Sequence, residues 1–511
     1  MNKNNYYITT PIYYPSGKPH MGHAYSSILA DVFARFKRND NCNVYFLTGT
    51  DEHGLKIQKA AANAGLEPLD FCDKISTVFK GLAIKLELSN DDFIRTTERR
   101  HHLAVNEIWN KLLKSGDIYL SKYKGWYSVS DEAYYNDDEI DEKDGKKIAI
   151  TSGSAVEWVE EESFFFELSS WQKKLLSFYE KNENFILPIS RRNEVINFVK
   201  GGLNDLSVSR TSFTWGIKVP GNDKHVIYVW LDALTNYLSA LEYPKTNSTL
   251  FKKYWPASVH VIGKDILRFH AIYWPAFLLA AKIEPPLRVF SHGWIMSGDE
   301  KMSKSKGNIL DPQEIIETYG IDPLRYYLMK EVSHGSDGSI SLKNLENCTN
   351  SDLANNFGNL CQRVFSFIEN NCKSIVYRTQ NLSDIDKKLI QDTKILTKEL
   401  RSFMEKQDLN SYIKFVIEIS FLTNKYINEE EPWKLKKTNL ERMNNVLHIA
   451  LEQIAKISIL LNPIIPIASC KVLDALNIEK KLRTLSFLED ENILKDKTEI
   501  KKLDILFKKF S

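Results

Sequence analysis

Two strand-loop-helix units open the chain, and they limit its fold more than any other feature of the sequence. The first has a strand-like stretch at 6–10, a loop with three prolines and a glycine, and a helical segment that is apolar on one face and ends near Arg38. The second has a strand-like stretch at 44–48, a loop at 49–54 and a helical segment at 55–64. This repeat predicts a doubly wound parallel sheet whose ligands lie at the carboxyl ends of its strands.

The same pattern returns later in the chain, after an interruption. Apolar strand-like stretches at 226–230, 259–263 and 289–293 resume the α/β order. Before them, residues 116–223 are rich in aromatic residues and short β-like pieces, which is typical of an inserted unit with its own small core. After about Asp352 the chain is rich in Lys, Glu, Leu and Ile with helical periodicity, which predicts a helical bundle.

A length of 511 residues suggests three or four domains. The predicted fold class is α/β: a Rossmann-like doubly wound parallel sheet, interrupted by a small insertion domain and followed by an all-α helical bundle. The predicted division is the first half of the α/β domain at 1–115, the insertion at 116–223, the second half of the α/β domain at 224–295, a lysine-rich loop and connector at 296–350, and the bundle at 351–511.

Charge, cysteine spacing and hydropathy narrow the class of protein. The chain has 68 Lys and Arg against 66 Asp and Glu, and a net charge of +2 neither requires nor excludes a polyanionic partner. The six cysteines are scattered without a Cys-x-x-Cys pair, which excludes a four-thiolate zinc site and favours reduced thiols in the cytoplasm. The N-terminus lacks the apolar stretch of a secretory signal, and the longest apolar run, 271–281, is far short of the ~20 residues that a membrane span needs. We expect a cytoplasmic protein that is neither exported nor embedded in a membrane.

The first cluster with chemical meaning is His20-Met21-Gly22-His23, where the first strand leads into its helix. Two imidazoles three positions apart, beside a glycine and a helix N-terminus, can contact one anion from a single short loop. The alternative is a pair of unrelated surface histidines, and this motif alone leaves both interpretations open. A metal site is disfavoured because no third ligand lies at helical spacing.

The second cluster is the loop 301–308, which reads Lys-Met-Ser-Lys-Ser-Lys-Gly-Asn. Short side chains around three lysines make a mobile cationic loop that suits the β- and γ-phosphates of a nucleotide, where charge develops in the transition state. The alternative is a solvated basic turn. The two clusters occur about 280 residues apart, on either side of one interrupted α/β domain.

Together the two clusters resemble the signatures of the class I aminoacyl-tRNA synthetases. Residues 20–23 are similar to the first signature, with Met21 in place of the usual isoleucine, and 301–305 match the second in full. The exchange of isoleucine for methionine is apolar for apolar, so we expect this side chain to pack inward. Segments that resemble the methionyl family are 10–15, 49–54, 229–233 and 262–270, and the resemblance extends from Tyr6 to about Leu461.

The resemblance implies an activity in two steps, without a protein nucleophile. L-methionine and ATP would give methionyl-adenylate and pyrophosphate, and methionine would then pass to the 3′-terminal adenosine of tRNA(Met), for initiation and elongation. The residues implied to bind ATP are His20, His23, Gly263, Asp265, Lys301 and Lys304, of which the two histidines and the two lysines are catalytic. Mg²⁺ is implied on the phosphate oxygens.

The resemblance also implies a methionine site. Its residues are Ile12, Tyr14, Trp230, Ala233, Tyr237, Ile266 and His270 around the thioether, with Asp51 on the ammonium group. Aromatic rings suit a polarisable thioether, and a carboxylate suits the α-amino group. For Trp230 and Tyr237, seven positions apart, the alternative is an ordinary core stripe on one helix.

The insertion departs from many members of the family, which carry a zinc knuckle of cysteine pairs at this place. This chain has no cysteine between Cys72 and Cys348. Segments 126–135 and 153–160 resemble the metal-free branch of the family, so no bound zinc is expected. With about 100 residues, the insertion also looks too small for the hydrolytic editing domain of related synthetases.

In the C-terminal bundle, Asn355, Asn359 and Arg363 share a helical face by their spacing, and Trp433 follows Pro432. The resemblance implies that Asn359, Arg363 and Trp433 read the CAU anticodon, with the indole stacked on a base. The alternative is a solvated helix face with Trp433 in the core.

Two other functions stay open from the sequence alone. One is a smaller nucleotidyltransferase that does not act on tRNA, which the helical C-terminal region and the complete lysine loop disfavour. The other is an RNA-binding relative that lost catalysis, which the complete set of active-site residues disfavours. Because no tRNA-binding barrel of the kind that some relatives use to dimerise follows the bundle, we expect a monomer.

Overall fold

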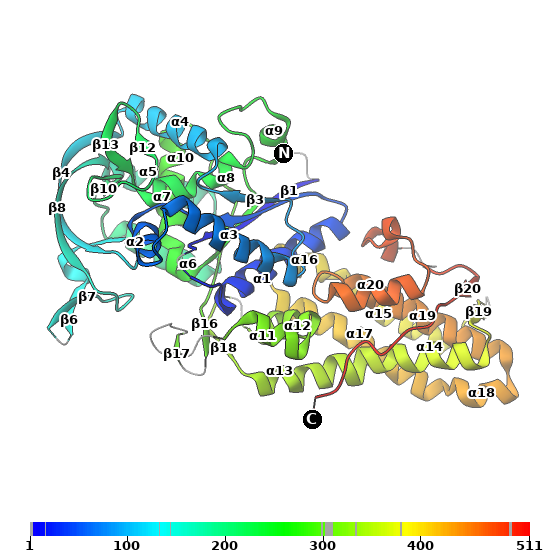
Figure 1. Cartoon of the computed structure of the whole chain (residues 1–511). Helices are drawn as coiled ribbons and strands as arrows, with labels where there is room; N and C mark the ends of the chain where they lie inside the picture. Colours follow the sequence, from blue (N-terminus) through cyan, green and yellow to red (C-terminus); the bar gives the residue numbers. More distant parts are fainter. Residues whose placement is uncertain are drawn as a thin grey trace.

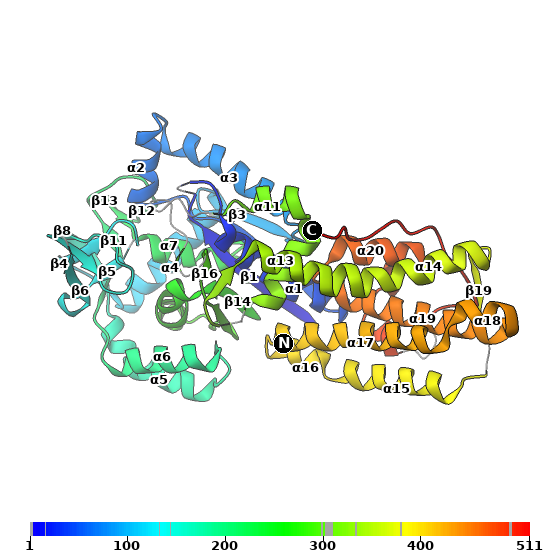
Figure 2. The ribbon, with the colours of Figure 1, turned by 90° about the horizontal axis from the view of Figure 1, so that it is seen from below.

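The computed structural model describes residues 4–15, 17–131, 133–143, 145–297, 300–301, 310–332, 335–378, 381–489 and 493–510. Figure 1 shows an α/β part, coloured blue to green, beside a helical part, coloured yellow to red. The view from below in Figure 2 shows the same two parts end to end, with the long helices of the second part roughly side by side. Within the described ranges, no helix has the length and the apolar character that crossing a membrane requires.

The centre of the α/β part is a sheet of six strands in the order β3-β2-β1-β14-β15-β9, and every neighbouring pair is parallel. Its strands are β1 (Asn5–Tyr13), β2 (Asn43–Thr50), β3 (Asp92–Arg95), β9 (Ile186–Leu187), β14 (Val259–Gly263) and β15 (Val289–His292). The consecutive residues Tyr7 and Ile8 of β1 belong to two different apolar clusters, so the sheet is buried on both faces. The predicted doubly wound parallel sheet is confirmed.

The first strand is longer than the sequence predicts. It continues through Pro11 to Tyr13, and its pairing with β2 shifts register between Thr9 and Ile12. A proline has no N–H to donate, so an irregularity at this point lets the strand continue. The extension carries Ile12 and Tyr13 to the carboxyl edge of the sheet.

Helices cover both faces of the sheet. They are α1 (Met21–Asn39), α3 (Pro68–Lys85), α4 (Arg99–Ser115), α9 (Thr249–Tyr254) and α10 (Trp274–Ala280), whereas α2 (Leu55–Asn63) packs on α3. Helix α1 buries Ile28, Leu29, Val32 and Phe36 against the sheet, at the positions that the apolar periodicity indicates.

The predicted insertion forms its own antiparallel sheet but does not have a separate core. The strands of this sheet, in order, are β10 (Leu206–Ser207), β8 (Glu157–Phe166), β4 (Ile118–Ser128) and β5 (Ala133–Tyr135). The same segment also contains a hairpin, β6 (Ile140–Lys143) and β7 (Lys146–Ala149), and two helices, α5 (Gln172–Lys181) and α6 (Ile189–Lys200). Phe166 lies in the same apolar cluster as Tyr7 of the central sheet. Strand β9, although inside 116–223, pairs with β15 of that sheet. The segment therefore shares its core with the α/β domain, and the predicted domain boundaries stay a prediction.

The prediction of a parallel strand at 226–230 is wrong in two respects. Strand β13 (Asn222–Ile227) is antiparallel and joins β11 (Ser209–Arg210) and β12 (Lys218–Val219) in a small sheet of its own. Trp230 lies in a short helix, α7 (Val229–Leu234), which α8 (Asn236–Ser239) follows. A five-residue apolar run does not distinguish a strand from a buried helical turn.

A connector leads from the sheet into the bundle. It has β16 (Ile295–Ser297), β17 (Glu300–Lys301), β18 (Gly338–Ile340), α11 (Pro312–Tyr319), α12 (Ile321–Glu331), α13 (Leu342–Cys348) and a π-helical stretch at Thr349–Gly358. The bundle has α14 (Asn359–Asn371), α15 (Asp384–Lys398), α16 (Leu400–Glu405), α17 (Leu409–Glu430), α18 (Pro432–Thr438), α19 (Leu440–Leu461) and α20 (Pro466–Ala475). Near the end of the chain, β20 (Lys497–Glu499) pairs with β19 (Ile375–Tyr377). The predicted helical bundle is confirmed.

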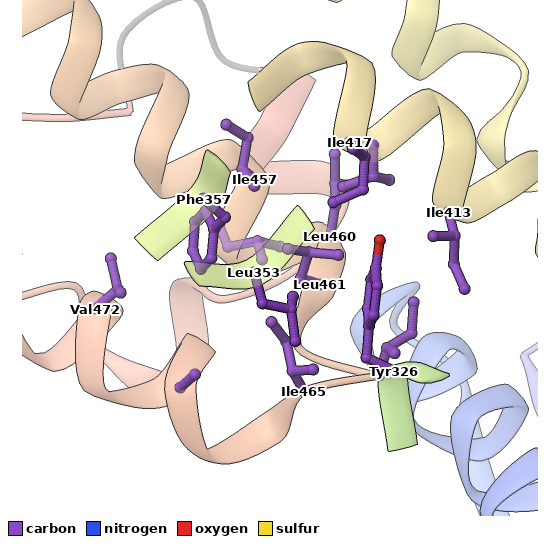
Figure 3. Close-up of a cluster of buried hydrophobic side chains, with 14 of the residues drawn as sticks. Tyr326, Leu353, Phe357, Ile413, Ile417, Ile457, Leu460, Leu461, Ile465 and Val472 are labelled. Atoms are coloured by element: carbon purple, nitrogen blue, oxygen red, sulfur yellow. The ribbon is translucent and has the colours of Figure 1, made fainter. Parts of the chain in front are cut away.

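Figure 3 shows where the connector and the bundle share one apolar core. Tyr326 of α12 lies among Ile413 and Ile417 of α17 and Leu460 and Leu461 of α19, and all five side chains are buried. These side chains belong to one continuous apolar cluster, so its burial stabilises the joint between the connector and the bundle.

A single buried arginine joins three parts of the molecule. The guanidinium of Arg325 donates to Asp31 of α1 at 2.7 Å, to the carbonyl of Leu86 after α3 at 3.0 Å, and to the carbonyls of Pro463 and Ile464 between α19 and α20 at 2.8 and 2.9 Å. Burial alone would raise the pKa of Asp31, but Arg325 holds it below its usual range. Because both charges are fully buried, removing one partner would leave the other uncompensated.

Candidate active site

A cavity of about 710 Å³ opens at the carboxyl edge of the central sheet. The predicted site residues that line it are Ile12, Tyr14, His20, His23, Asp51, Trp230, Ala233, Tyr237, Gly263, Asp265, Ile266 and His270. They come from both halves of the interrupted α/β domain. Of the two predicted lysines, Lys301 has its backbone in β17, and Lys304 lies outside the described residues.

His20 and His23 form the N-terminal cap of α1. Nδ1 of His20 accepts from the N–H of Gly22 at 3.1 Å, and Nδ1 of His23 accepts from the N–H of His20 at 3.0 Å. Because Nδ1 accepts a hydrogen bond in both rings, the ring hydrogen of each histidine is assigned to Nε2. The two rings lie 3.8 Å apart between centroids and both line the cavity. Two N–H donors and a helix N-terminus therefore face the same space, which suits an anion.

The position of the His20 ring requires a glycine at position 22. A Cβ atom at this position would lie 2.9 Å from Cε1 of His20. The absence of a side chain therefore lets the His20 ring fold over the backbone and cap the helix. Met21 is fully buried, as expected for the residue that replaces isoleucine.

Buried hydrogen bonds fix one wall of the cavity. Nδ1 of His270 lies 3.0 Å from the carbonyl of Ile266 and Nε2 lies 2.7 Å from Oη of Tyr237. Burial lowers the pKa of His270 to about 4, so the ring is neutral, donates from Nδ1 and accepts the Tyr237 hydroxyl proton at Nε2. Tyr237 also stacks on His260 with centroids 4.0 Å apart. The orientation of the Tyr237 ring is thus set by the protein itself.

Trp230 forms another wall, on a different helix from Tyr237. Its indole stacks on Phe269 with centroids 3.6 Å apart and planes only 6° apart. Trp230 lies in α7 and Tyr237 in α8, the two short helices on either side of Thr235. Both border the cavity, and aromatic faces of this kind suit an apolar or polarisable ligand group.

Asp51 supplies a carboxylate at the base of this wall. It directly follows β2, its N–H donates to the carbonyl of Tyr13 at 2.9 Å, and its side chain is buried. The neighbouring Tyr14 donates from Oη to the carbonyl of His53 at 2.8 Å. A buried carboxylate that borders a cavity is suited to a ligand cation such as an ammonium group.

The end of β14 meets the cavity closely. A Cβ atom at Gly263 would lie 2.5 Å from Oδ1 of Asp265, so glycine permits the turn that places this carboxylate. Next to it, Lys264 pairs with Asp337 at 2.7 Å and lies 3.8 Å above the ring of Trp294.

Several cavity residues are missing from the sequence prediction. His292 ends β15; its Nδ1 donates to the carbonyl of Gly293 at 2.7 Å, and its Nε2 lies 2.7 Å from Oγ of Ser26 in α1. Its place at the end of a predicted strand is the signal that could have found it. Asp131 and Ser152 of the insertion also border the cavity, and no pattern in the sequence points to them.

The acidic and thiol groups do not form a metal site in the part of the chain that the structure describes. No group of three or more His, Cys, Asp or Glu side chains there is arranged to hold a metal ion. The absence of zinc stays a prediction. Mg²⁺ fits the cavity only as an ion bound mainly by the phosphates of a ligand, with at most one or two carboxylates such as Asp265.

The predicted anticodon residues lie together at the far end of the bundle. The guanidinium of Arg363 lies 5.5 Å from the ring centroid of Trp433 and donates to Oδ1 of Asn428 at 2.8 Å. Arg363 and Trp433 line a small apolar pocket of about 190 Å³, and Asn359 is exposed one turn before Arg363. The indole of Trp433 is 40% exposed, so it is not a core residue.

Comparison with known proteins gives a consistent result. Residues 6–144 and 143–365 match the family "tRNA synthetases class I (M)", and 376–511 match "Anticodon binding domain of methionyl tRNA ligase". The methionine–tRNA ligase of Rickettsia typhi is 49% identical over 99% of this chain and 100% of its own length, and that of Brucella suis is 49% identical over 94% and 93%.

Solved structures give the same result. The Mycobacterium tuberculosis methionyl-tRNA synthetase in complex with methionyl-adenylate superposes with a TM-score of 0.96, at 43% identity and 99% coverage of both chains. The free form of that protein has a TM-score of 0.89, at 39% identity over 99% of this chain and 98% of its own. On these matches, the chain belongs to the methionyl class I tRNA synthetases, the ATP-dependent ligases that join methionine to tRNA.

Proposed function

We propose that the 710 Å³ cavity binds L-methionine and ATP together and carries out both steps of methionyl-tRNA synthesis. The observation that carries this proposal is the convergence on one cavity of a buried carboxylate, an aromatic wall and two imidazole N–H donors. A carboxylate oxygen of methionine attacks the α-phosphorus of ATP, the bond to the bridging oxygen breaks, and pyrophosphate leaves. The 3′-terminal hydroxyl of tRNA(Met) then attacks the acyl carbon, and AMP leaves.

The methionine end of the cavity is the wall at Tyr237 and Trp230. Asp51 pairs with the ammonium group of the substrate, and the thioether lies among aromatic and aliphatic side chains. These side chains are Ile12, Tyr14, Trp230, Ala233, Tyr237, Ile266 and His270. The neutral state of His270 suits contact with an uncharged sulfur.

The nucleotide end of the cavity is the cap of α1 together with the end of β14. The Nε2–H groups of His20 and His23 donate to phosphate oxygens near the reacting phosphorus, and Gly263 and Asp265 meet the adenosine. Lys301 and Lys304 stabilise the departing pyrophosphate, and Mg²⁺ on the phosphates neutralises charge there. Neither step uses a protein nucleophile, so catalysis consists of positioning and charge stabilisation.

The second contact with tRNA lies on the bundle. Asn359, Arg363 and Trp433 read the CAU anticodon, with the indole stacked on an unpaired base and the polar groups on base edges. Support comes from the exposed indole beside a guanidinium. We further propose a cytoplasmic monomer that charges the tRNAs of both initiation and elongation.

The test is amino-acid-dependent exchange of pyrophosphate into ATP with each of the twenty amino acids, followed by aminoacylation of tRNA(Met). Exchange with methionine alone, and charging of tRNA that carries a CAU anticodon, are expected. Exchange with another amino acid overturns the proposal. Tight tRNA binding without exchange would favour a relative that lost catalysis, and exchange without charging would favour a nucleotidyltransferase that does not act on tRNA.

A further inference from the structure

Behind the proposed methionine pocket lies a buried cluster of four side chains that the steps above do not use. Asp232 of α7 has its Oδ1 2.6 Å from Nε2 of His101 in α4 and its Oδ2 2.7 Å from Nδ1 of His53. Nδ1 of His101 lies 2.8 Å from Oγ of Ser239 in α8. All four side chains are buried, and none of them lines the cavity.

The hydrogen bonds of this cluster extend to the backbone. Oγ of Ser239 lies 2.8 Å from the carbonyl of Thr235 as well as 2.8 Å from Nδ1 of His101. Nε2 of His101 donates to the carboxylate of Asp232. Asp232 is thus linked through His101 to α8.

The carboxylate is held ionised in spite of its burial. Burial alone would raise the pKa of Asp232, but the charges and hydrogen bonds of His53 and His101 hold it well below its usual range. A buried carboxylate of this kind is stable only while its donors stay in place. The three elements that carry Asp232, His53 and His101 are therefore fixed relative to one another.

Two of these elements carry residues that line the proposed methionine pocket. Helix α7 carries Trp230, two residues before Asp232. The loop after β2 carries Asp51, two residues before His53, and the carbonyl of His53 also holds the hydroxyl of Tyr14. The bond between Asp232 and His53 thus joins the aromatic wall to the loop with the carboxylate.

We infer that Asp232 is a positioning residue that sets the separation between the ammonium site at Asp51 and the thioether wall at Trp230. The inference rests on the proposed function, because it concerns the same pocket. A ligand that must reach both ends depends on this separation, whereas a nucleotide bound at the cap of α1 does not. Asp232 therefore determines the affinity for methionine and leaves the affinity for ATP unchanged.

The test is Asp232→Asn, compared with Asp223→Asn at an exposed position of β13 outside the cavity. Asparagine has one acceptor oxygen, and its amide nitrogen does not accept from an imidazole N–H, so one of the two bonds is lost together with the negative charge of the carboxylate. We expect the KM for methionine in pyrophosphate exchange to rise about tenfold to hundredfold, with the KM for ATP within about twofold. The inhibition constant of L-methioninol, which keeps the ammonium group and the thioether, should rise by the same factor.

Equal changes in the two KM values, or an unchanged KM for methionine, would overturn the inference. If Asp232→Asn does not fold, Ser239→Ala removes the hydroxyl that contacts Nδ1 of His101 and the carbonyl of Thr235 and leaves Asp232 itself in place. A rise in the KM for methionine alone is expected, and no rise overturns the inference. The two levels of failure are distinct. A wild-type chain without methionine-dependent exchange refutes the proposed function, whereas an active wild type with no methionine-specific loss in the variants refutes only the role of Asp232.

Discussion

The proposed methionine pocket and the Trp433 pocket on the bundle differ in how their aromatic side chains are held. Tyr237 is 1% exposed and hydrogen-bonded to a neutral imidazole, whereas Trp433 is 40% exposed beside Arg363. The Tyr237 ring is held by contacts within the protein, and a ring held in this way lowers the entropic cost of binding a small molecule. The Trp433 pocket leaves an indole face to be covered by the ligand itself, which suits a large partner with its own exposed rings. Preorganisation in this molecule therefore matches the size of the proposed ligand.

The largest expected effect is at the cap of α1. His20→Asn keeps a good N-cap residue but removes the imidazole donor, so the exchange rate should fall by about 100-fold to 1000-fold. The melting temperature should change little, because the helix stays capped. Pyrophosphate exchange and a thermal unfolding curve measure the two effects. A rate within a few-fold of the wild type would show that the ring only caps the helix.

The second effect is a loss of stability in acid that is concentrated in the α/β part. Burial lowers the pKa of His260, His270 and His292, and for His270 to about 4. The folded state keeps these rings neutral, while the unfolded chain binds protons below a pKa of about 6.5. The free energy of unfolding should therefore fall as the pH drops from about 6.5 to 4, by on the order of 3 kcal/mol for His270 alone.

The bundle should respond less over the same pH range. Burial lowers the pKa of His448, but it raises the pKa of Glu452, which acts in the opposite sense. Urea unfolding between pH 7.5 and 4.5, with hydrogen exchange read by mass spectrometry, locates the part that opens first. His270→Gln should flatten the pH dependence of the unfolding free energy. Earlier opening of the bundle in acid would reverse the comparison.

A smaller effect is expected at Trp433. Trp433→Ala removes a stacking surface, so kcat/KM for charging of tRNA(Met) should fall about tenfold or more, with pyrophosphate exchange unchanged. Phe421→Ala is the matched control, because Phe421 is also an exposed aromatic residue of the bundle, 51% exposed on α17. The same loss in both variants would point to general damage of the bundle, and no loss in either would remove the anticodon role.

A zinc chelator is expected to have no effect on activity, because we expect no bound zinc. Elemental analysis of the purified protein should find far less than one zinc ion per chain, and pyrophosphate exchange should survive treatment with a zinc chelator in excess Mg²⁺. Stoichiometric zinc, with loss of activity on chelation, would contradict the predicted absence of zinc.

The parts of the site that local sequence determines could be predicted, and the parts that tertiary contacts determine could not. His20 and His23 interact within one helical turn, so their motif is visible in the sequence. The bond between His53 and Asp232 joins residues 179 positions apart and has no local signal. The apolar run at 226–230 predicts a strand at Trp230, but a run this short fits a helical turn equally well, and Trp230 lies in α7 with its indole stacked on Phe269.

The fold divides in the same way. The hydrophobic periodicity and the turn residues predict the parallel strands and the bundle. Strand β9 has only two residues, and it is defined by its pairing with β15. The shared core of the insertion likewise depends on contacts between distant segments, such as Phe166 and Phe277 with ring centroids 4.9 Å apart.

The buried junction at Arg325 also affects the distance between the two proposed tRNA contacts. It fastens helix α1, which carries His20 and His23, to the segment between α19 and α20 of the bundle. The junction therefore constrains the distance between the two proposed tRNA contacts, the cavity at the sheet and the Trp433 pocket on the bundle. An RNA that reaches both at once must match this spacing, so overall size and shape would select the partner before any base is read.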